Sequence, residues 1–199
     1  MLDSGSPQFD FEKYRSLMAS AWEGHELFAY NFVRNVKPRV IVELGTFTGF
    51  SFFVMAQAVK DAKLSSKLFA IDTWEGDKHT GFYDDSVYKF VKGLKNRFYA
   101  EQKIKFLRKT FKEANKDFRD NSIDLLHIDG LHTYKAVKGD FEMWLPKMNK
   151  NGVIFFHDIA VPYFGVRRFW AEIEKKYPTN SFSHSYGLGI IFLGKVYQL

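Results

Sequence analysis

Apolar residues follow two spacings along this chain, and segments of the two kinds alternate. Short apolar runs bounded by polar residues predict buried strands. These runs cover residues 40–44, 67–71, 104–107, 123–128 and 153–156. Between them, apolar residues recur every three or four positions and predict helices that bury one face. These helices cover residues 51–60, 87–98, 134–144 and 166–173, and a capping box of Thr110 and Glu113 opens another.

Alternating strands and helices predict an α/β fold, in which a mostly parallel sheet carries helices on both faces. Two features extend this pattern at the ends of the chain. A helix expected over 24–36 precedes the first strand, so residues 1–37 form a helical lead-in to a domain that covers 38–199. Near the C-terminus, two strands around Tyr186 and Gly187 predict an antiparallel hairpin added to the sheet.

The composition fits a single globular domain. The chain has 199 residues, of which 46% are hydrophobic, so it can bury a large core and is not disordered. It contains no cysteine, which excludes disulfides and thiolate metal sites. No apolar run approaches the roughly 20 residues that span a membrane, and the N-terminus lacks the pattern of a secretion signal. We therefore expect a cytoplasmic protein without a membrane span.

The net charge of +6 is concentrated in one segment. Residues 92–120 contain ten basic and four acidic side chains. A solvated helical surface explains most charge runs of this kind. The alternative is a patch for an anionic partner, such as a nucleotide-sugar, a lipid-linked glycan carrier or a membrane surface. No RNA-recognition signature with interleaved aromatic residues accompanies the charges, so we do not expect sequence-specific nucleic acid binding.

The first strand ends in the most informative motif of the chain. Residues 43–51 have the pattern E-x-G-x-x-x-G-x-S, in which an acid ends the strand, glycines form the turn and a serine begins the next helix. Glycines let the main chain approach a ligand closely, and the N–H groups of the first helical turn face that ligand. Glu43 would repel a pyrophosphate and attract an ammonium or sulfonium cation. The spacing also departs from G-x-G-x-x-G, the dinucleotide-binding fingerprint.

Four of the predicted strands end in titratable residues. These residues are Glu43, Asp72, Asp129 and the pair His157-Asp158. Ligands of open parallel sheets bind beyond the carboxyl ends of the strands, and a carboxylate there costs desolvation unless it is paired. Asp72 is placed to accept both hydroxyls of a ribose. Trp74, two residues later, is placed either to cover an adenine face or to be a core or lid residue.

Asp129 and Asp158 end adjacent strands of the predicted sheet, so their carboxylates should converge. Two hard oxygen donors with water suit Mg²⁺ or Mn²⁺, and a nitrogen from His157 would favour Mn²⁺, iron or zinc. His132 lies one turn beyond Asp129. A nearby cation would keep its imidazole neutral, and a neutral imidazole can take a proton as a general base. His127, inside a strand, is expected to be a core residue.

Longer segments resemble a known family. The segments IDGLHTY at 128–134, DFEMWLP at 140–146 and His157-Asp158 resemble metal-dependent O-methyltransferases of the type often associated with glycosyltransferases. Residues 72–83 resemble that family's loop after the second strand, and Gly187-Leu188-Gly189 resembles its closing hairpin. The pattern at 43–51 looks like the first motif of class I S-adenosylmethionine-dependent methyltransferases. Together the resemblance covers roughly residues 38–195.

The resemblance implies a Rossmann-like class I methyltransferase fold. It also implies an O-methyltransferase that uses S-adenosylmethionine, with a divalent metal (Mg²⁺ or Mn²⁺), on a hydroxyl of a sugar, glycan or other small molecule. Asp129 and Asp158 would hold the metal, His157 would replace an acid common in related sites, and His132 would be the base. The cofactor would lie against the ends of the first two strands. Its predicted contacts are Glu43, Gly45, Thr46, Gly49, Ser51, Asp72, Thr73 and Trp74.

Three other functions are compatible with parts of the sequence. A nucleic-acid methyltransferase would use the basic segment, but the metal motif argues against it. A nicotinamide oxidoreductase would share the fold, but Glu43 and the glycine spacing oppose it. A non-catalytic module would bind S-adenosylmethionine without turnover. The sequence allows an oligomer and does not specify one.

Overall fold

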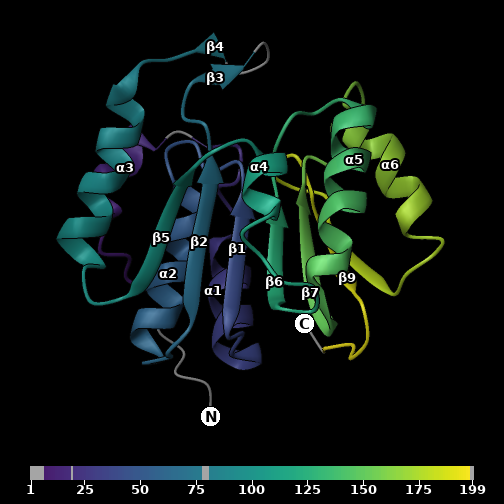
Figure 1. The fold of residues 1–199 in the computed structure, drawn as a ribbon, viewed down its shortest axis with the longest axis horizontal. Helices are drawn as coiled ribbons and strands as arrows, with labels where there is room; N and C mark the ends of the chain where they lie inside the picture. Colours follow the sequence, from purple (N-terminus) through teal and green to yellow (C-terminus); the bar gives the residue numbers. More distant parts are fainter. Residues whose placement is uncertain (1–6, 19, 78–80, 198–199) are drawn as a thin grey trace.

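The computed structural model describes residues 7–18, 20–77 and 81–197, so residues 78–80 of the loop at 72–83 lie outside the described residues. Within these ranges the main sheet has seven strands in the order β5-β2-β1-β6-β7-β9-β8 (Figure 1). The parallel strands are β1 (Val40–Leu44), β2 (Lys67–Asp72), β5 (Lys103–Arg108), β6 (Ile123–Ile128) and β7 (Met148–His157). The C-terminal hairpin consists of β8 (Thr179–Phe182) and β9 (Leu188–Phe192).

This architecture confirms the predicted α/β fold and the C-terminal hairpin. Strand β9 runs antiparallel to both of its neighbours, β7 and β8. Because β9 lies between them, the last strand of the chain is interior and β8 forms the edge of the sheet. The strand order reverses between β1 and β6, and the carboxyl ends of the strands at such a reversal leave a crevice for a ligand.

Helices cover both faces of the sheet, as predicted (Figure 1). One face carries α1 (Glu26–Val36), α2 (Phe50–Asp61) and α3 (Asp85–Phe98). The other face carries α4 (Phe111–Asn115), α5 (Tyr134–Trp144) and α6 (Gly165–Ile173). Shorter elements are the 3₁₀ helices η1 (Glu12–Leu17) and η2 (Leu145–Lys147) and a two-stranded hairpin of β3 (Gly76–Asp77) and β4 (Gly81–Phe82). The predicted capping box of Thr110 and Glu113 is present at the start of α4.

The apolar core forms two clusters, one on each face of the sheet. The N-terminal lead-in belongs to the cluster on the α1–α2 side, since Phe11, Trp22 and Phe32 are buried in it. The lead-in therefore shares one core with the sheet, and the division of the chain at residue 37 stays a prediction.

The basic residues of 92–120 are divided between the two faces of the sheet. Helix α3 packs on one face through Val91 and Leu94, and α4 packs on the other face through Ala114. Strand β5 between them is an edge strand, where exposed lysines such as Lys103 discourage pairing with another chain. The basic side chains of this segment thus belong to elements on both faces and at the edge of the sheet, and an anionic partner stays a prediction.

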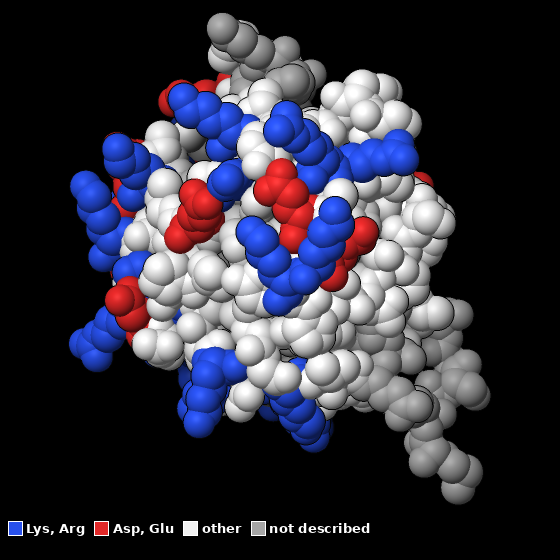
Figure 2. Space-filling model, turned by 90° about the vertical axis from the view of Figure 1, so that its right-hand side faces the viewer, with Lys and Arg blue, Asp and Glu red and all other residues white. Residues whose placement is uncertain are grey.

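Charges of both signs also alternate elsewhere on the surface. Figure 2 shows the side of the molecule that carries α5 and α6, where acidic side chains are interspersed among the basic ones. Among the described residues, no helix combines the length and the apolar character needed to cross a bilayer.

Candidate functional site

A cavity of about 610 Å³ opens beyond the carboxyl ends of the parallel strands. Its volume lies in the range of small-molecule binding sites. Residues that follow each of the five parallel strands line it, together with parts of the lead-in and of the hairpin tip. The lining residues include Ser20, Ala21, Gly45, Thr46, Ser51, Asp72, Thr73, Lys109, Thr110, Phe111, Asp129, Gly130, Leu131, His132, Asp140, His157, Asp158, Phe164 and Tyr186. The cavity thus lies where the strand order predicted a ligand site.

The two glycines of the first motif have separate structural roles. Gly45 has a φ of +88°, and a Cβ there would come within 1.9 Å of the Asp129 carbonyl oxygen. Only glycine therefore lets the loop after β1 approach the loop after β6. Gly49, with a φ of +87°, precedes α2, and a Cβ there would meet the Phe53 ring at 2.8 Å. Gly45 lines the cavity, whereas Gly49 does not.

Asp72 ties the end of β2 to the glycine loop. Its Oδ2 accepts hydrogen bonds from the backbone N–H groups of Thr46 at 3.0 Å and Phe47 at 2.9 Å. Its Oδ1 accepts from Trp74 N at 2.7 Å. Asp72, Thr46 and Thr73 all line the cavity. Asp72 therefore holds the glycine loop at the wall of the cavity.

Glu43 lies beneath the cavity, behind Ser51. It has no exposed surface, and its Oε2 accepts from Ser51 Oγ at 2.7 Å and lies 2.8 Å from His127 Nδ1. Burial raises the pKa of Glu43. Glu43 Oε1 and Thr46 Oγ1 are buried and have no hydrogen-bond partner among the described residues. Ser51 lines the cavity and Glu43 does not. Glu43 would therefore contact a ligand only from beneath the cavity wall, beside Ser51.

The prediction that Trp74 covers an adenine face is wrong. Its side chain is fully buried and its ring packs against Tyr88 and Phe106, with centroids 5.1 and 5.6 Å away. The indole Nε1 donates to the Phe47 carbonyl at 2.9 Å. The core alternative is the correct one, because the backbone of Trp74 turns to a φ of +53° and carries the ring back under the sheet edge.

We expect Trp74→Phe to lower the free energy of unfolding by about 1–2 kcal/mol, since it removes buried volume and one hydrogen bond. The same change should leave the affinity for a cavity ligand within about threefold, because the ring does not line the cavity. Urea unfolding and calorimetric titration measure the two effects. A large loss of affinity at unchanged stability would contradict this assignment.

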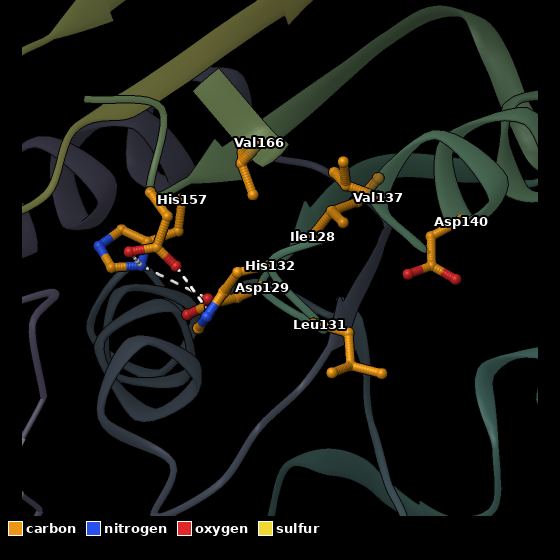
Figure 3. A pocket seen from close by; sticks show the side chains of 10 residues that line it. Ile128, Asp129, Leu131, His132, Val137, Asp140, His157 and Val166 are labelled. Carbon is orange, nitrogen blue, oxygen red and sulfur yellow. Dashed lines mark ion pairs between the residues drawn. The ribbon is translucent and has the colours of Figure 1, made fainter. Parts of the chain in front are cut away.

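Asp129, His132 and Asp158 form a cluster, and one donor atom from each lies within 4.8 Å of the other two. Figure 3 shows Asp129 and His132 close together, whereas Asp140 lies apart from them on α5. His132 Nε2 lies 2.9 Å from Asp158 Oδ2, and the His132 ring stacks on Phe164 at 4.2 Å. The predicted convergence of the two carboxylates is confirmed.

Close contacts between charged groups in this cluster shift the pKa values of His132 and Asp158. Burial acts to lower the pKa of His132, but the hydrogen bond and charge of Asp158 outweigh it and the pKa is raised. Burial acts to raise the pKa of Asp158, but hydrogen bonds from His132 and His157 hold it well below its usual range.

His157 is not part of the cluster of potential metal ligands, contrary to the prediction. Its Nε2 lies 3.0 Å from the Ser185 carbonyl, which can only accept, so Nε2 carries a proton. Its Nδ1 lies 3.4 Å from an oxygen of Asp129 and from one of Asp158. Burial acts to lower the pKa of His157, but these two carboxylates raise it to about 10. His157 is therefore a cation that holds both carboxylates.

Sequence reasoning missed several residues of the cavity. Lys109, Thr110 and Phe111 follow β5, and the only sequence signal there was the capping box. Asp140 lines the end of the cavity near Gly130 and Leu131, and burial raises its pKa to about 6. The remaining residues come from distant segments. They are Ser20 and Ala21 of the lead-in, Phe164 before α6 and Tyr186 of the hairpin tip.

Residues 42–159 match a protein family described as "Methyltransferase domain". Over 178 residues the chain is 45% identical to protein y4gI of Sinorhizobium fredii, which is named as uncharacterized. That alignment covers 88% of this chain and 19% of y4gI, so the chain spans only part of the length of this relative.

Solved structures show a similar fold. A methyltransferase from Geobacter sulfurreducens has a TM-score of 0.71 and 16% identity, with 97% of this chain and 94% of that chain covered. The O-methyltransferase TomG from Streptomyces achromogenes, in complex with S-adenosylmethionine, has a TM-score of 0.69 and 14% identity, with 97% and 93% covered. At these identities the likeness concerns the fold.

Proposed function

The chain belongs to the methyltransferase domain family, and from this premise we propose that it transfers a methyl group from S-adenosylmethionine to a hydroxyl oxygen of a small molecule. One observation carries the proposal. The glycine loop after β1 and the cluster of Asp129, His132 and Asp158 line the same cavity. A cofactor on the loop would lie beside an acceptor at the cluster, as methyl transfer requires.

The residues of the glycine loop fit S-adenosylmethionine. Glu43 Oε1 and Thr46 Oγ1 are buried acceptors without a partner among the described residues, and a ligand ammonium group would satisfy them. Asp72 lies at the cavity where it can accept from ribose hydroxyls. The loop approaches Asp129 so closely that a side chain at Gly45 would be excluded, which leaves backbone to face the cofactor.

The cluster fits a divalent cation. Two carboxylates and one imidazole suit Mn²⁺ better than Mg²⁺, because a nitrogen donor is softer than oxygen. We assign His132 to the ligands, since it offers one of three close donor atoms and its Nε2 lies 2.9 Å from Asp158 Oδ2. Bound there, a divalent cation would supply Lewis-acid stabilisation to the charge of an ionising hydroxyl.

The chain's own residues would prepare this site. Asp129 and Asp158 face one point because His157 holds an oxygen of each. Phe164 fixes the plane of the His132 ring by stacking on it, and so restricts where Nε2 points.

We propose a sugar or glycan hydroxyl as the first acceptor class to test. Carboxylates at the cluster can accept hydrogen bonds from neighbouring hydroxyls, and rings such as Tyr186 and Phe164 can cover the apolar face of a sugar. Small phenols are the second class. A screen of both with isotope-labelled S-adenosylmethionine, with and without Mn²⁺, tests the function. Absence of turnover with every acceptor, despite cofactor binding, would favour a non-catalytic binding module.

We expect the chain to bind S-adenosylhomocysteine and to bind NAD⁺ negligibly. Glu43→Gln and Asp72→Asn should each weaken the binding of S-adenosylhomocysteine by about 1–3 kcal/mol, or roughly 5- to 150-fold in Kd. The reason is that each substitution removes a charged partner of the ligand. Calorimetric titration measures both ligands. Asp61→Asn is the control, since Asp61 accepts from Tyr30 outside the cavity. Comparable affinity for NAD⁺ would refute the cofactor assignment.

A further inference from the structure

A chain of buried hydrogen bonds joins the N-terminal lead-in to the wall of the cavity. The Trp22 indole Nε1–H donates to His127 Nε2 at 3.2 Å, and His127 Nδ1 lies 2.8 Å from Glu43 Oε2. Ser51 Oγ donates to the same Glu43 oxygen at 2.7 Å. Trp22, His127 and Glu43 are fully buried, and Ser51 is 6% exposed. The lead-in, β6, β1 and α2 each contribute one of these groups.

Trp22 determines the direction of these hydrogen bonds. An indole nitrogen can only donate, so His127 Nε2 is the accepting, unprotonated nitrogen. The ring proton is then on Nδ1, which donates to Glu43. Without the indole, the other tautomer becomes accessible, and its Nδ1 lone pair would face the Glu43 carboxylate.

The segment that carries Trp22 is held in place from the opposite side. The hydroxyl of Ser185, at the hairpin tip, donates to the Glu23 carbonyl, and the His184 ring lies 3.2 Å from the Gly24 carbonyl oxygen. Ser20 and Ala21, next to Trp22 in the chain, line the cavity. The lead-in is therefore fixed between the hairpin and the sheet, and its Trp22 cannot easily turn away from His127.

We propose that Trp22 is a positioning residue of the cofactor site, acting through His127 on the orientation of Glu43. This inference rests on the proposed function, in which Glu43 receives the ammonium group of S-adenosylmethionine. Ser51 and His127 both use Oε2, and Oε1 has no hydrogen-bond partner in the part of the chain that the structure describes. Fixing Oε2 fixes where Oε1 points. Trp22 thus serves the cofactor although it does not line the cavity.

Calorimetric titration with S-adenosylhomocysteine tests this role. Trp22→Phe keeps an aromatic ring and removes the donor, so it should raise Kd about 3- to 10-fold, the effect of one hydrogen bond. Trp144→Phe is the matched control. Trp144 is equally buried, and its indole nitrogen has no hydrogen-bond partner among the described residues. It should leave Kd within about twofold even where it lowers stability.

A second variant separates positioning from packing. In His127→Asn the amide nitrogen can replace Nδ1 as the donor to Glu43 but does not reach Trp22. Adding Trp22→Phe in that background should leave Kd unchanged, because the path through the imidazole is already broken. A role of Trp22 in packing alone would instead produce the same effect in both backgrounds, and that result would overturn the inference.

Wild-type protein gives a measurement that needs no variant. On addition of S-adenosylhomocysteine, the indole N–H resonance of Trp22 should shift and exchange more slowly with solvent, since coupling between two sites is reciprocal. The Trp144 resonance should not change. An unchanged Trp22 resonance together with an unchanged Kd in Trp22→Phe would overturn the inference about Trp22 but not the proposed function. Failure of the wild type to bind S-adenosylhomocysteine would overturn the proposed function and the inference with it.

Discussion

Asp158→Asn should strongly reduce metal-dependent methyl transfer while the protein stays folded and still binds S-adenosylhomocysteine. Asp158 contributes a donor atom to the cluster with Asp129 and His132, and its carboxylate is almost fully buried. Its φ of +67° lies in the left-handed region, which asparagine tolerates better than most residues, so this variant keeps the turn after β7. Loss of one anionic ligand should reduce turnover by about 10³-fold, equivalent to roughly 4 kcal/mol of transition-state stabilisation.

Two measurements check this expectation separately. Titration with Mn²⁺ should show a strongly raised Kd in Asp158→Asn and in Asp129→Asn, and titration with S-adenosylhomocysteine should show a Kd close to wild type. Asp140→Asn should retain Mn²⁺ affinity, because Asp140 lines the same cavity but lies outside the cluster. In the wild type, a chelator should remove the activity and Mn²⁺ should restore it. Full activity in chelator would contradict the metal assignment.

The sequence predicted the position of the site because that position follows from periodicity. Strands that alternate with helices form a parallel sheet, and the carboxyl ends of parallel strands share one edge. Asp72 is the last residue of β2, Asp129 and Asp158 directly follow β6 and β7, and all three line the cavity. Gly45 was predictable for the same reason, since a ligand-facing turn after a buried strand needs a residue that allows close approach.

The roles of individual side chains were harder to predict, because they depend on contacts between distant segments. His157 becomes a cation because Asp129 and Asp158 lie beside its Nδ1. The carbonyl of Ser185, in the connection between β8 and β9, accepts from its Nε2. Trp74 follows Asp72 closely in sequence, but the turn of its backbone directs the ring into the core. The link from Trp22 to His127 joins residues 105 positions apart, which no local pattern can indicate.

The basic residues at 92–120 are a second case in which the sequence alone does not predict the arrangement in space. Its density is visible in the sequence, but whether the charges form a patch depends on which face of the sheet each element covers. Helices α3 and α4 pack on opposite faces. Arg108 pairs with Asp85 and Lys109 with Asp117, so part of the charge is neutralised locally.

His132→Ala should lower turnover about 10²- to 10⁴-fold, and it should also weaken Mn²⁺ binding. The sequence predicted a general base at this position, and a base alone would explain the loss of rate. The structure adds that His132 Nε2 lies 2.9 Å from Asp158 Oδ2, within a cluster of three donor atoms. A ligand role therefore predicts a second effect, a Kd for Mn²⁺ raised at least about tenfold.

The Mn²⁺ dependence of the His132→Ala activity separates the two roles. If His132 is a ligand, the variant needs more Mn²⁺ to reach half of its maximal rate, and saturating Mn²⁺ recovers part of the loss. If His132 acts only as a base, the Mn²⁺ titration matches the wild type and the rate stays low at every concentration. Phe164→Leu is the companion variant, because it removes the ring stacked on His132 and leaves all three donors in place. Phe164→Leu should also raise the Mn²⁺ concentration needed for half of the maximal rate, but by less than His132→Ala does, since the imidazole would then be less well oriented.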